Sequence, residues 1–349
     1  GRLALQHILF GQIRFFWVAL FSVLMEAAAA FDIDKHRITE PTAAVYTPMK
    51  SNSLELDLDS ISKYAEHLVR VNITSILSAG TNGESLSLSV VERKALAEAW
   101  ARAGPPLGIR VYVHVGAESL ADAVELARHA ASTSGVSGTV CMTPVFFKPT
   151  LTALHDFLAV VAAAAPELPF WYYHFPGISG VLPGQAHKLL EMVEESGRIP
   201  NFEGIKYTDY NLMDFQLCMQ VGGTRKYNML YGRDEQVLSA LQMGCDGLVS
   251  STVQFSPTLR TVVSSYRRSD GSSAQAAQLE NAKLCAKFGA YQSDVNVQKG
   301  IMRMTGLDVG PSRLPKRDLS SSEYTALERE LVNEGLIDQP GSSLTNDVR

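Results

Sequence analysis

Residues 168–209 read LPFWYYHFPGISGVLPGQAHKLLEMVEESGRIPNFEGIKYTD and hold two short β-rich runs on either side of a longer segment. Phe170–His174 and Gly204–Tyr207 have the length and composition of strands, and Gly184–Ser196 has the apolar spacing of a helix. A strand, a helix and a second strand in this order predict two parallel strands joined by a crossover helix.

The same alternation extends along most of the chain and predicts eight strands with eight helices. The predicted strands are Ala43–Tyr46, Ser75–Ser78, Arg110–His114, Gly138–Met142, Phe170–His174, Gly204–Tyr207, Asn228–Tyr231 and Gly247–Ser250. The predicted helices are Leu58–Val71, Ser89–Ala103, Leu120–Ser132, Leu151–Ala165, Gly184–Ser196, Leu212–Val221, Glu235–Met243 and Ser256–Arg268. Eight such units indicate an α/β fold, a (β/α)8 TIM barrel. The alternative, a doubly wound open sheet, usually has a Gly-rich dinucleotide turn after its first strand, and this sequence has none.

The chain divides by pattern into three segments. Residues 38–268 form the barrel, and residues 269–349 form a C-terminal helical extension with three additional helices, near 274–290, 295–304 and 321–333. Residues 1–37 are a leader-like or unassigned extension; the leader-like interpretation rests on the apolar run Phe15–Met25, which precedes the small residues Ala27–Ala30 as in a signal peptide. That apolar run is short for a membrane span.

Composition excludes some partners and leaves the compartment open. A net charge of −5 and the absence of a Lys/Arg-rich tract argue against nucleic-acid binding. The cysteines Cys141, Cys218, Cys245 and Cys285 are widely spaced, which predicts reduced core thiols rather than a disulfide framework or a metal site. Reduced thiols favour the cytoplasm, whereas the leader-like segment favours secretion, and we expect the cytoplasm.

Lys206 is unusual because it lies inside a predicted strand, where an inward-facing ammonium group loses its hydration. Burial favours the neutral amine, which is the form that attacks a ketone to give an imine. Alternatively, Lys206 points outward or forms an ion pair with Glu203 or Asp209. The strand pattern alone leaves both interpretations open.

Other polar residues follow the predicted strands, at the barrel end where loops carry catalytic groups. In Gly80–Glu84 the glycines permit positive φ angles, so that backbone N–H groups and the Thr81 hydroxyl can converge on a carboxylate, although a plain tight turn is the alternative. Tyr173, on the strand beside that of Lys206, is either a proton-transfer group or a core residue, and Tyr172 should face the helices.

Asp234 and Glu235 begin a predicted helix after the seventh strand. Their charges either stabilise the helix start or accept hydrogen bonds from sugar hydroxyl groups.

Four strings in chain order resemble the N-acetylneuraminate lyase branch of the dihydrodipicolinate synthase superfamily of class I aldolases, from about Pro41 to Pro315. They are GTNGESLSLSVVER at 80–93, LPFWYYHFPGISGV at 168–181, GIKYTD at 204–209 and YGRDEQVLSAL at 231–241. They are similar to that family's carboxylate loop, tyrosine strand, Schiff-base strand and sugar-binding loop.

The resemblance implies roles for nine residues. Lys206 would form the imine, Tyr173 would transfer a proton, and Thr81 with the Asn82 amide would bind the substrate carboxylate. The residues that would contact the sugar chain are Thr208, Gly232, Asp234, Glu235 and Ser251. The implied reaction splits sialic acid (N-acetylneuraminate) into N-acetylmannosamine and pyruvate in a homotetramer. No metal, nucleotide or flavin cofactor is implied, because the lysine imine is itself the electron sink.

Some positions depart from the family pattern. Dihydrodipicolinate synthases typically have an arginine in a PGRT-like string after the tyrosine, whereas residues 176–179 here read PGIS. The missing guanidinium argues against an acidic aldehyde and favours a polyhydroxylated one. Asn82 replaces a hydroxyl residue, Phe146 replaces a tyrosine that completes a relay from a neighbouring subunit, and Ser250 replaces a glycine, which predicts a narrower pocket.

Two other functions fit the same motifs. One is another pyruvate-dependent aldolase or dehydratase of the superfamily, similar to dihydrodipicolinate synthase or 4-hydroxy-2-oxoglutarate aldolase. The other is a catalytically silent barrel that binds a sugar acid or a protein partner and forms no imine.

Overall fold

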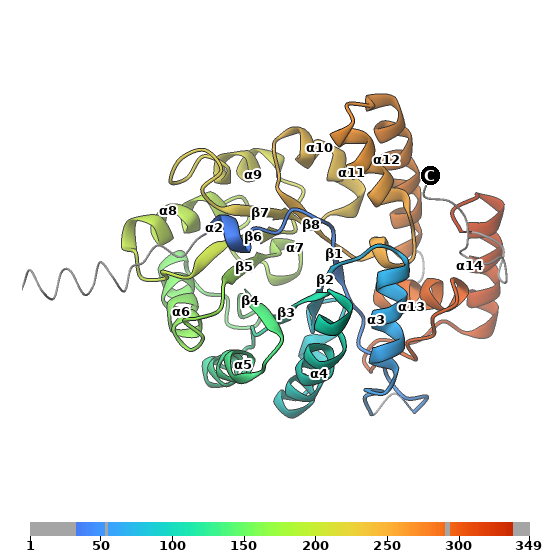
Figure 1. Cartoon of the computed structure of the whole chain (residues 1–349), viewed down its shortest axis with the longest axis horizontal. Coiled ribbons are helices and arrows are strands. Elements are labelled where there is room, and N and C mark those ends of the chain that lie inside the picture. The colour runs from blue at the N-terminus through green and yellow to red at the C-terminus, as the bar shows by residue number, and fades with distance from the viewer. Residues whose placement is uncertain (1–32, 53–54, 290–293, 338–349) are drawn as a thin grey trace, which may run out of the picture. The chain divides into compact units, whose positions relative to one another are not determined.

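The computed structural model describes residues 33–52, 55–289 and 294–337 (Figure 1). The chain separates into two units, residues 1–36 and residues 37–349. In the first unit the description is limited to the short helix α2, Ile33–His36, so the leader-like run at 15–30 lies outside the described residues. No helix in the described ranges is long and apolar enough to cross a lipid bilayer. The second unit contains the barrel and the C-terminal helices.

Eight parallel strands close into a barrel in chain order, because β1 pairs with both β2 and β8 (Figure 1). The strands are β1 Thr42–Ala44, β2 Ser75–Ser78, β3 Arg110–His114, β4 Val136–Met142, β5 Phe170–His174, β6 Phe202–Tyr207, β7 Asn228–Tyr231 and β8 Gly247–Ser250. The predicted α/β fold, a (β/α)8 TIM barrel, is confirmed.

Helices surround the barrel, and three more follow the last strand-helix unit. The surrounding helices are α3 Ser60–Arg70, α4 Val90–Ala103, α5 Leu120–Ser132, α6 Leu151–Ala163, α7 Pro176–Ser179, α8 Ala186–Ser196, α9 Leu212–Cys218, α10 Val237–Gln242 and α11 Thr258–Arg267. The additional helices are α12 Gly271–Phe288, α13 Asp294–Met304 and α14 Ser321–Asn333, as predicted. Helix α12 packs on α11, and α13 packs on α12 and α14.

A predicted helix and a predicted strand differ from the observed elements. The segment predicted as one helix, 235–243, is a 3-10 turn, Asp234–Gln236, followed by α10. The first strand ends at Ala44 and not at Tyr46, and the Tyr46 hydroxyl donates to Gln298 of α13 at 3.0 Å. The Asp234 carbonyl oxygen in the turn accepts hydrogen bonds from Gln278 and Asn281 of α12 at 3.1 and 3.0 Å. A local sequence pattern does not contain such contacts between distant residues.

The helix starts follow from local sequence. Ser89 caps α4 in a capping box, since its hydroxyl accepts the Glu92 N–H while the Glu92 carboxylate accepts the Ser89 N–H. Thr150 caps α6 in the simpler way, through its side chain alone. These caps fix where each helix leaves the loop that precedes it.

Two apolar cores hold the barrel together. The larger one lies between strands and helices, and the smaller one fills the barrel interior around Trp171, which packs edge-on against Tyr112 with ring centroids 5.3 Å apart. At the amino-terminal end of β7, Asn228 accepts the Trp171 indole N–H at 3.2 Å and exchanges two 3.1 Å hydrogen bonds with the Ile38 backbone. These hydrogen bonds tie the segment before β1 to the amino-terminal end of β7, opposite the barrel end where catalytic loops lie.

Candidate active site

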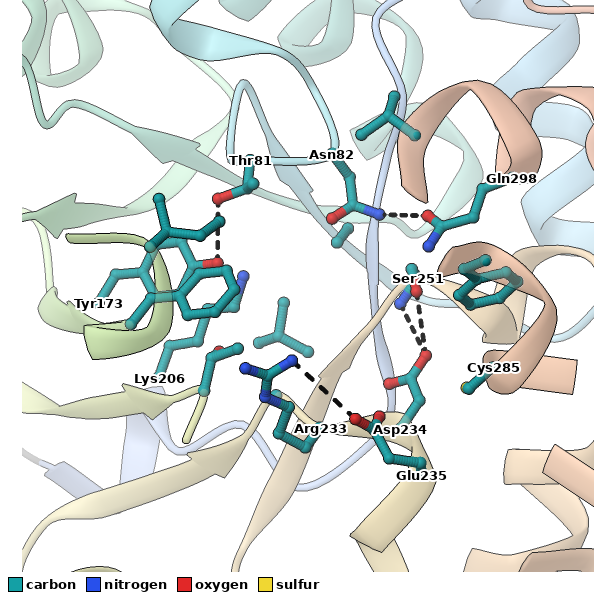
Figure 2. Close-up of a pocket in the computed structure, with 18 of the residues that line it drawn as sticks. Thr81, Asn82, Tyr173, Lys206, Arg233, Asp234, Glu235, Ser251, Cys285 and Gln298 are labelled. Carbon is teal, nitrogen blue, oxygen red and sulfur yellow. Dashed lines mark hydrogen bonds and ion pairs between the residues drawn. The ribbon is translucent and has the colours of Figure 1, made fainter. Parts of the chain in front are cut away.

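A cavity of about 630 Å³ lies at the carboxyl ends of the strands (Figure 2). All nine residues predicted from the sequence line it, namely Thr81, Asn82, Tyr173, Lys206, Thr208, Gly232, Asp234, Glu235 and Ser251. The structure therefore brings together residues from five loops and strands that are up to 170 positions apart in the sequence.

Lys206 is buried inside the barrel with 4% of its surface exposed. Its Nζ lies over the Tyr173 ring, 3.8 Å from the centroid. Within the described ranges, the Lys206 side-chain amine forms neither a hydrogen bond nor an ion pair, so it neither points outward nor pairs with Glu203 or Asp209. The amine is held by packing and a ring face, with its lone pair or protons available to a ligand in the cavity.

Tyr173 stands beside Lys206 because the two residues are register partners on β5 and β6. Its hydroxyl lies 3.1 Å from the Thr81 Oγ1, which joins the proton-transfer candidate to the carboxylate loop. Tyr172 faces the helix layer instead, where its hydroxyl lies 3.4 Å from His174 Nδ1. The predicted alternation of the two tyrosines is confirmed.

The imidazole group of His114 packs against Tyr173. The His114 ring meets the Tyr173 ring edge-on, with centroids 6.2 Å apart. Burial lowers the pKa of His114 well below its ordinary value, and the positive charges of Arg93 and Lys206 lower it further. His114 is therefore uncharged at neutral pH and adds no second cation beside Lys206.

The loop Gly80–Glu84 takes its shape differently from the sequence-based prediction. The residues with positive φ are Ala79, at 54°, and Glu84, at 56°, and not the glycines. Gly83 is required for close packing, since a Cβ there would lie 2.9 Å from the Ala79 Cα. The turn is thus tight, and it presents Thr81 and Asn82 to the cavity.

Glu84 anchors this loop to the C-terminal extension. Its carboxylate forms a 2.7 Å ion pair with Lys299 of α13, and both side chains are almost fully buried. The other oxygen accepts the Arg313 backbone N–H at 2.9 Å, and Lys299 also donates to the carbonyl oxygens of Thr47 and Pro311 at 3.0 and 2.8 Å. Burial lowers the pKa of Lys299 against the opposing effect of Glu84.

The Asn82 side chain forms a hydrogen bond with a residue of helix α13, outside the barrel. Its amide nitrogen donates to the Gln298 Oε1 at 2.8 Å, and the same oxygen accepts the Tyr46 hydroxyl at 3.0 Å. Gln298 also lines the cavity (Figure 2). The departure from a hydroxyl residue at position 82 therefore comes with an amide partner that fixes the side chain.

The Asp234 carboxylate accepts hydrogen bonds from neighbouring groups of the protein. Its Oδ2 accepts hydrogen bonds from Ser250 Oγ at 2.8 Å, Ser251 N at 3.1 Å, Ser251 Oγ at 3.2 Å and Thr252 N at 2.9 Å. Burial nevertheless raises the pKa of Asp234. Ser250 does not line the cavity, so the predicted narrowing is wrong, and its hydroxyl instead serves the Asp234 carboxylate.

Gly232 and Glu235 also line the cavity. A Cβ at Gly232 would lie 2.1 Å from the Thr208 Oγ1, so only glycine lets these two loops approach. Glu235 accepts the Tyr210 hydroxyl at 2.5 Å. Thr208 has no hydrogen-bond partner for its buried hydroxyl in the part of the chain that the structure describes, which leaves this group for a ligand.

Three residues in or beside the cavity are not among the residues predicted from the sequence. The first is Arg233, and a charged residue directly after the strand-end Gly232 is a usable signal for it. Gln298 and Lys299 lie in a helix beyond the barrel, and nothing in their local sequence distinguishes them. Phe146, predicted to replace a relay tyrosine, lies outside the cavity lining and is 77% exposed.

Comparisons with known proteins point to one group. Residues 38–334 match the model of the dihydrodipicolinate synthetase family. The chain is 38% identical to the N-acetylneuraminate lyase of Mus musculus over 296 residues, which is 84% of this chain and 91% of that protein. It is 40% identical to N-acetylneuraminate lyase A of Xenopus laevis over 278 residues, 78% of this chain and 88% of that protein. Among solved structures, the N-acetylneuraminate lyase of Proteus mirabilis superposes with a TM-score of 0.79 at 29% identity, covering 86% of this chain and all of that one.

Proposed function

The chain belongs to the dihydrodipicolinate synthetase family, and from that premise we propose that it is a class I aldolase that cleaves N-acetylneuraminate into N-acetylmannosamine and pyruvate. The observation that carries the proposal is the buried Lys206, which has no ion pair or hydrogen bond in the described part of the chain and lies 3.8 Å from the Tyr173 ring. A lysine held in this way is suited to nucleophilic attack rather than to structural pairing.

The first step joins Lys206 to the substrate. The neutral Nζ attacks the C2 ketone of the open-chain sugar acid and gives a carbinolamine. The Tyr173 hydroxyl then gives its proton to the C2 hydroxyl, which leaves as water, so that an iminium group and a Tyr173 phenolate remain. Thr81 and the backbone N–H of Asn82 hold the C1 carboxylate, since both face the cavity on the tight loop beside Tyr173. The iminium then withdraws electrons from the C3–C4 bond.

The second step breaks the carbon-carbon bond. The Tyr173 phenolate left by the first step accepts the proton of the C4 hydroxyl as the C3–C4 bond breaks, and C4 becomes the aldehyde of N-acetylmannosamine. The electron pair remains on C3 as an enamine, which takes up a proton. Water then hydrolyses the imine and releases pyruvate with the free lysine. The Thr81 Oγ1 lies 3.1 Å from the Tyr173 hydroxyl oxygen, a distance at which the Thr81 hydroxyl can donate a hydrogen bond to the phenolate.

The sugar chain would lie along the other polar residues of the cavity. Thr208 offers a buried hydroxyl without a protein partner among the described residues, and Glu235 and Ser251 offer further acceptors and donors. Asp234 would stabilise the residues that make these contacts, because its Oδ2 already accepts hydrogen bonds from the loop after β8.

Trapping of the imine tests the proposal. The purified protein is incubated with borohydride and either N-acetylneuraminate or pyruvate, and the peptides are then analysed by mass spectrometry. We expect a reduced pyruvyl adduct on Lys206 from both compounds and none in Lys206→Arg. An adduct from pyruvate alone would keep the imine chemistry but reject this sugar acid, as expected for another aldolase of the family. Absence of an adduct from both would favour a silent binding barrel.

We also expect a homotetramer. Phe146 and Phe147 are 77% and 78% exposed and pack edge-to-face with centroids 4.9 Å apart. Three successive backbone N–H groups of this loop, from Val145 to Phe147, donate to the Glu118 carboxylate at 2.9 to 3.0 Å, so the aromatic pair is held in place on the surface. Exposed, fixed aromatic residues favour a subunit contact. Light scattering on the wild type and Phe146→Asp tests this, and an unchanged mass would reject a contact through this loop.

The cytoplasm remains the expected compartment. Cys141, Cys218 and Cys245 are buried free thiols, and burial raises the pKa of Cys141 and Cys245 to about 12. Such thiols are typical of a reducing compartment. Fractionation of cells that express the tagged chain tests the expectation, and recovery from the medium would contradict it.

A further inference from the structure

Arg233 is a cation in the cavity wall that the reaction above does not use. It follows Gly232 at the end of β7 and lines the cavity together with Lys206 and Glu235 (Figure 2). Its guanidinium carbon lies 4.2 Å from the centroid of the Tyr210 ring and 4.9 Å from that of Phe175. Two aromatic rings therefore hold the group, which is the arrangement that fixes a guanidinium without consuming its N–H donors.

In the described part of the chain, no hydrogen-bond acceptor satisfies the donors of this guanidinium. The Arg233 side chain makes no hydrogen bond there, and its Nε is buried without a partner. Its one ion-pair contact there, to the Glu235 Oε1, is 3.9 Å long, which is beyond hydrogen-bond distance. Glu235 instead accepts the Tyr210 hydroxyl at 2.5 Å. A buried donor without an acceptor is costly, and a ligand that supplies oxygens removes that cost.

The position of Arg233 changes the expectation drawn from the sequence. The PGIS segment lacks the arginine that would meet an acidic aldehyde, but an Arg233 nitrogen lies 3.4 Å from where a Cβ of Gly177 would be. Gly177 belongs to that segment. A guanidinium thus reaches the same wall of the cavity from β7 instead of from β5. The cavity therefore has a guanidinium group, although the loop after β5 has no arginine.

We propose that Arg233 forms an oxyanion subsite, so that this cavity takes 2-keto acids whose aldehyde-derived half carries a carboxylate or a phosphate. The inference rests on the Lys206 imine chemistry of the proposed function but not on N-acetylneuraminate being the best substrate. The planar guanidinium offers two parallel N–H donors, and both oxyanions accept them. The bonds made and broken are those of the cleavage described above, with the anionic group on the released aldehyde.

Arg317 supplies a matched control. It is the same residue type and lines the same cavity, but its guanidinium is already paired with Glu323 at 2.8 and 2.9 Å. Arg233→Met and Arg317→Met therefore remove the same charge from the cavity wall, and only the first removes unsatisfied donors.

The test measures kcat/KM for condensation of pyruvate with three aldehydes: N-acetylmannosamine, its 6-phosphate and its 6-carboxylate analogue. In the full-length wild type we expect at least one anionic aldehyde to exceed the neutral one. Arg233→Met should lower that ratio by about 10- to 100-fold, the range given by a charged hydrogen bond. Arg317→Met should change it less than about two-fold, since an exposed paired charge contributes little.

Each outcome decides the inference. A preference for only one anion identifies the source as carboxylate or phosphate. A wild type that favours neither anion overturns the subsite, as does an equal loss for all three aldehydes in Arg233→Met or an equal loss of the ratio in Arg317→Met. Trapping of pyruvate on Lys206 is measured in every variant, so loss of imine formation, which would contradict the proposed function, is recognised separately.

Discussion

Substitution of Lys299 by methionine breaks the buried ion pair that joins the carboxylate loop to α13. The Lys299 and Glu84 side chains are 2% and 1% exposed and lie 2.7 Å apart. The Lys299→Met change would leave the buried Glu84 carboxylate without its ion-pair partner, and it would also leave the carbonyl oxygens of Thr47 and Pro311 without the Lys299 donor. Removal of one partner from such a pair costs about 3–5 kcal/mol of unfolding free energy.

A double variant of Glu84 and Lys299 tests whether the two charges of the ion pair act together. Burial outweighs the pairing with Glu84 in the pKa of Lys299, so the intact pair carries its own desolvation cost. Loss of both charges, in Glu84→Gln with Lys299→Met, should therefore cost less than the sum of the two single changes, by about 0.5–3 kcal/mol.

Urea denaturation at a fixed protein concentration gives these free energies. The KM for N-acetylneuraminate should rise in Lys299→Met, because the loop that presents Thr81 loses its support. If Lys299→Met stays within about 1 kcal/mol of the wild type, or if the two substitutions are additive, the pair does not hold the loop and the reasoning is wrong.

Three further changes test the site and its supports. Tyr173→Phe should lower kcat by about 10²- to 10⁴-fold while borohydride still traps pyruvate, and an unchanged kcat would contradict its proton-transfer role. Gly232→Ala places a Cβ 2.1 Å from the Thr208 Oγ1 and should destabilise the fold by about 1–3 kcal/mol with a loss of kcat/KM, whereas a fully active variant would refute the close approach. The Arg313 hydrogen bonds lower the pKa of Glu92 to about 2, so this carboxylate stabilises the fold above its ordinary pKa of 4.5 and loses that effect as the pH falls toward 2. Glu92→Gln should therefore cost about 1–3 kcal/mol at pH 7 and much less near pH 2, as measured by urea denaturation, and a cost independent of pH would contradict the pairing.

The barrel was predictable because its strands and helices repeat a pattern that is local in the sequence. Strand β5 was predicted at its observed bounds, since five consecutive residues of strand type are enclosed by Pro169 and by Pro176. The nine predicted site residues were also found together, because parallel strands of one barrel all present their carboxyl ends to the same side. Lys206 faces inward as the imine hypothesis requires, but its role as nucleophile stays a prediction.

Details of the loops were not predictable in the same way. The glycines of residues 80–84 suggested positive φ angles, yet those angles occur at Ala79 and Glu84. Glu84, one of these two residues, forms a buried ion pair with Lys299, which lies more than 200 residues away in the chain. A residue type states which conformations are allowed, and distant contacts select among them.

The eight-fold alternation, the barrel and the choice of Lys206 and Tyr173 as candidates could be read from the sequence, since each depends on residue type and on spacing within a short stretch. Which hydrogen-bond donors are already used and which remain for a ligand could be read only from the folded chain. Asp234 is satisfied by the β8 loop, whereas Arg233 is held between two rings with its hydrogen-bond donors unsatisfied in the described part of the chain. Hydrogen-bond satisfaction is set by distances between side chains from separate loops, and those distances are fixed only when the barrel has closed.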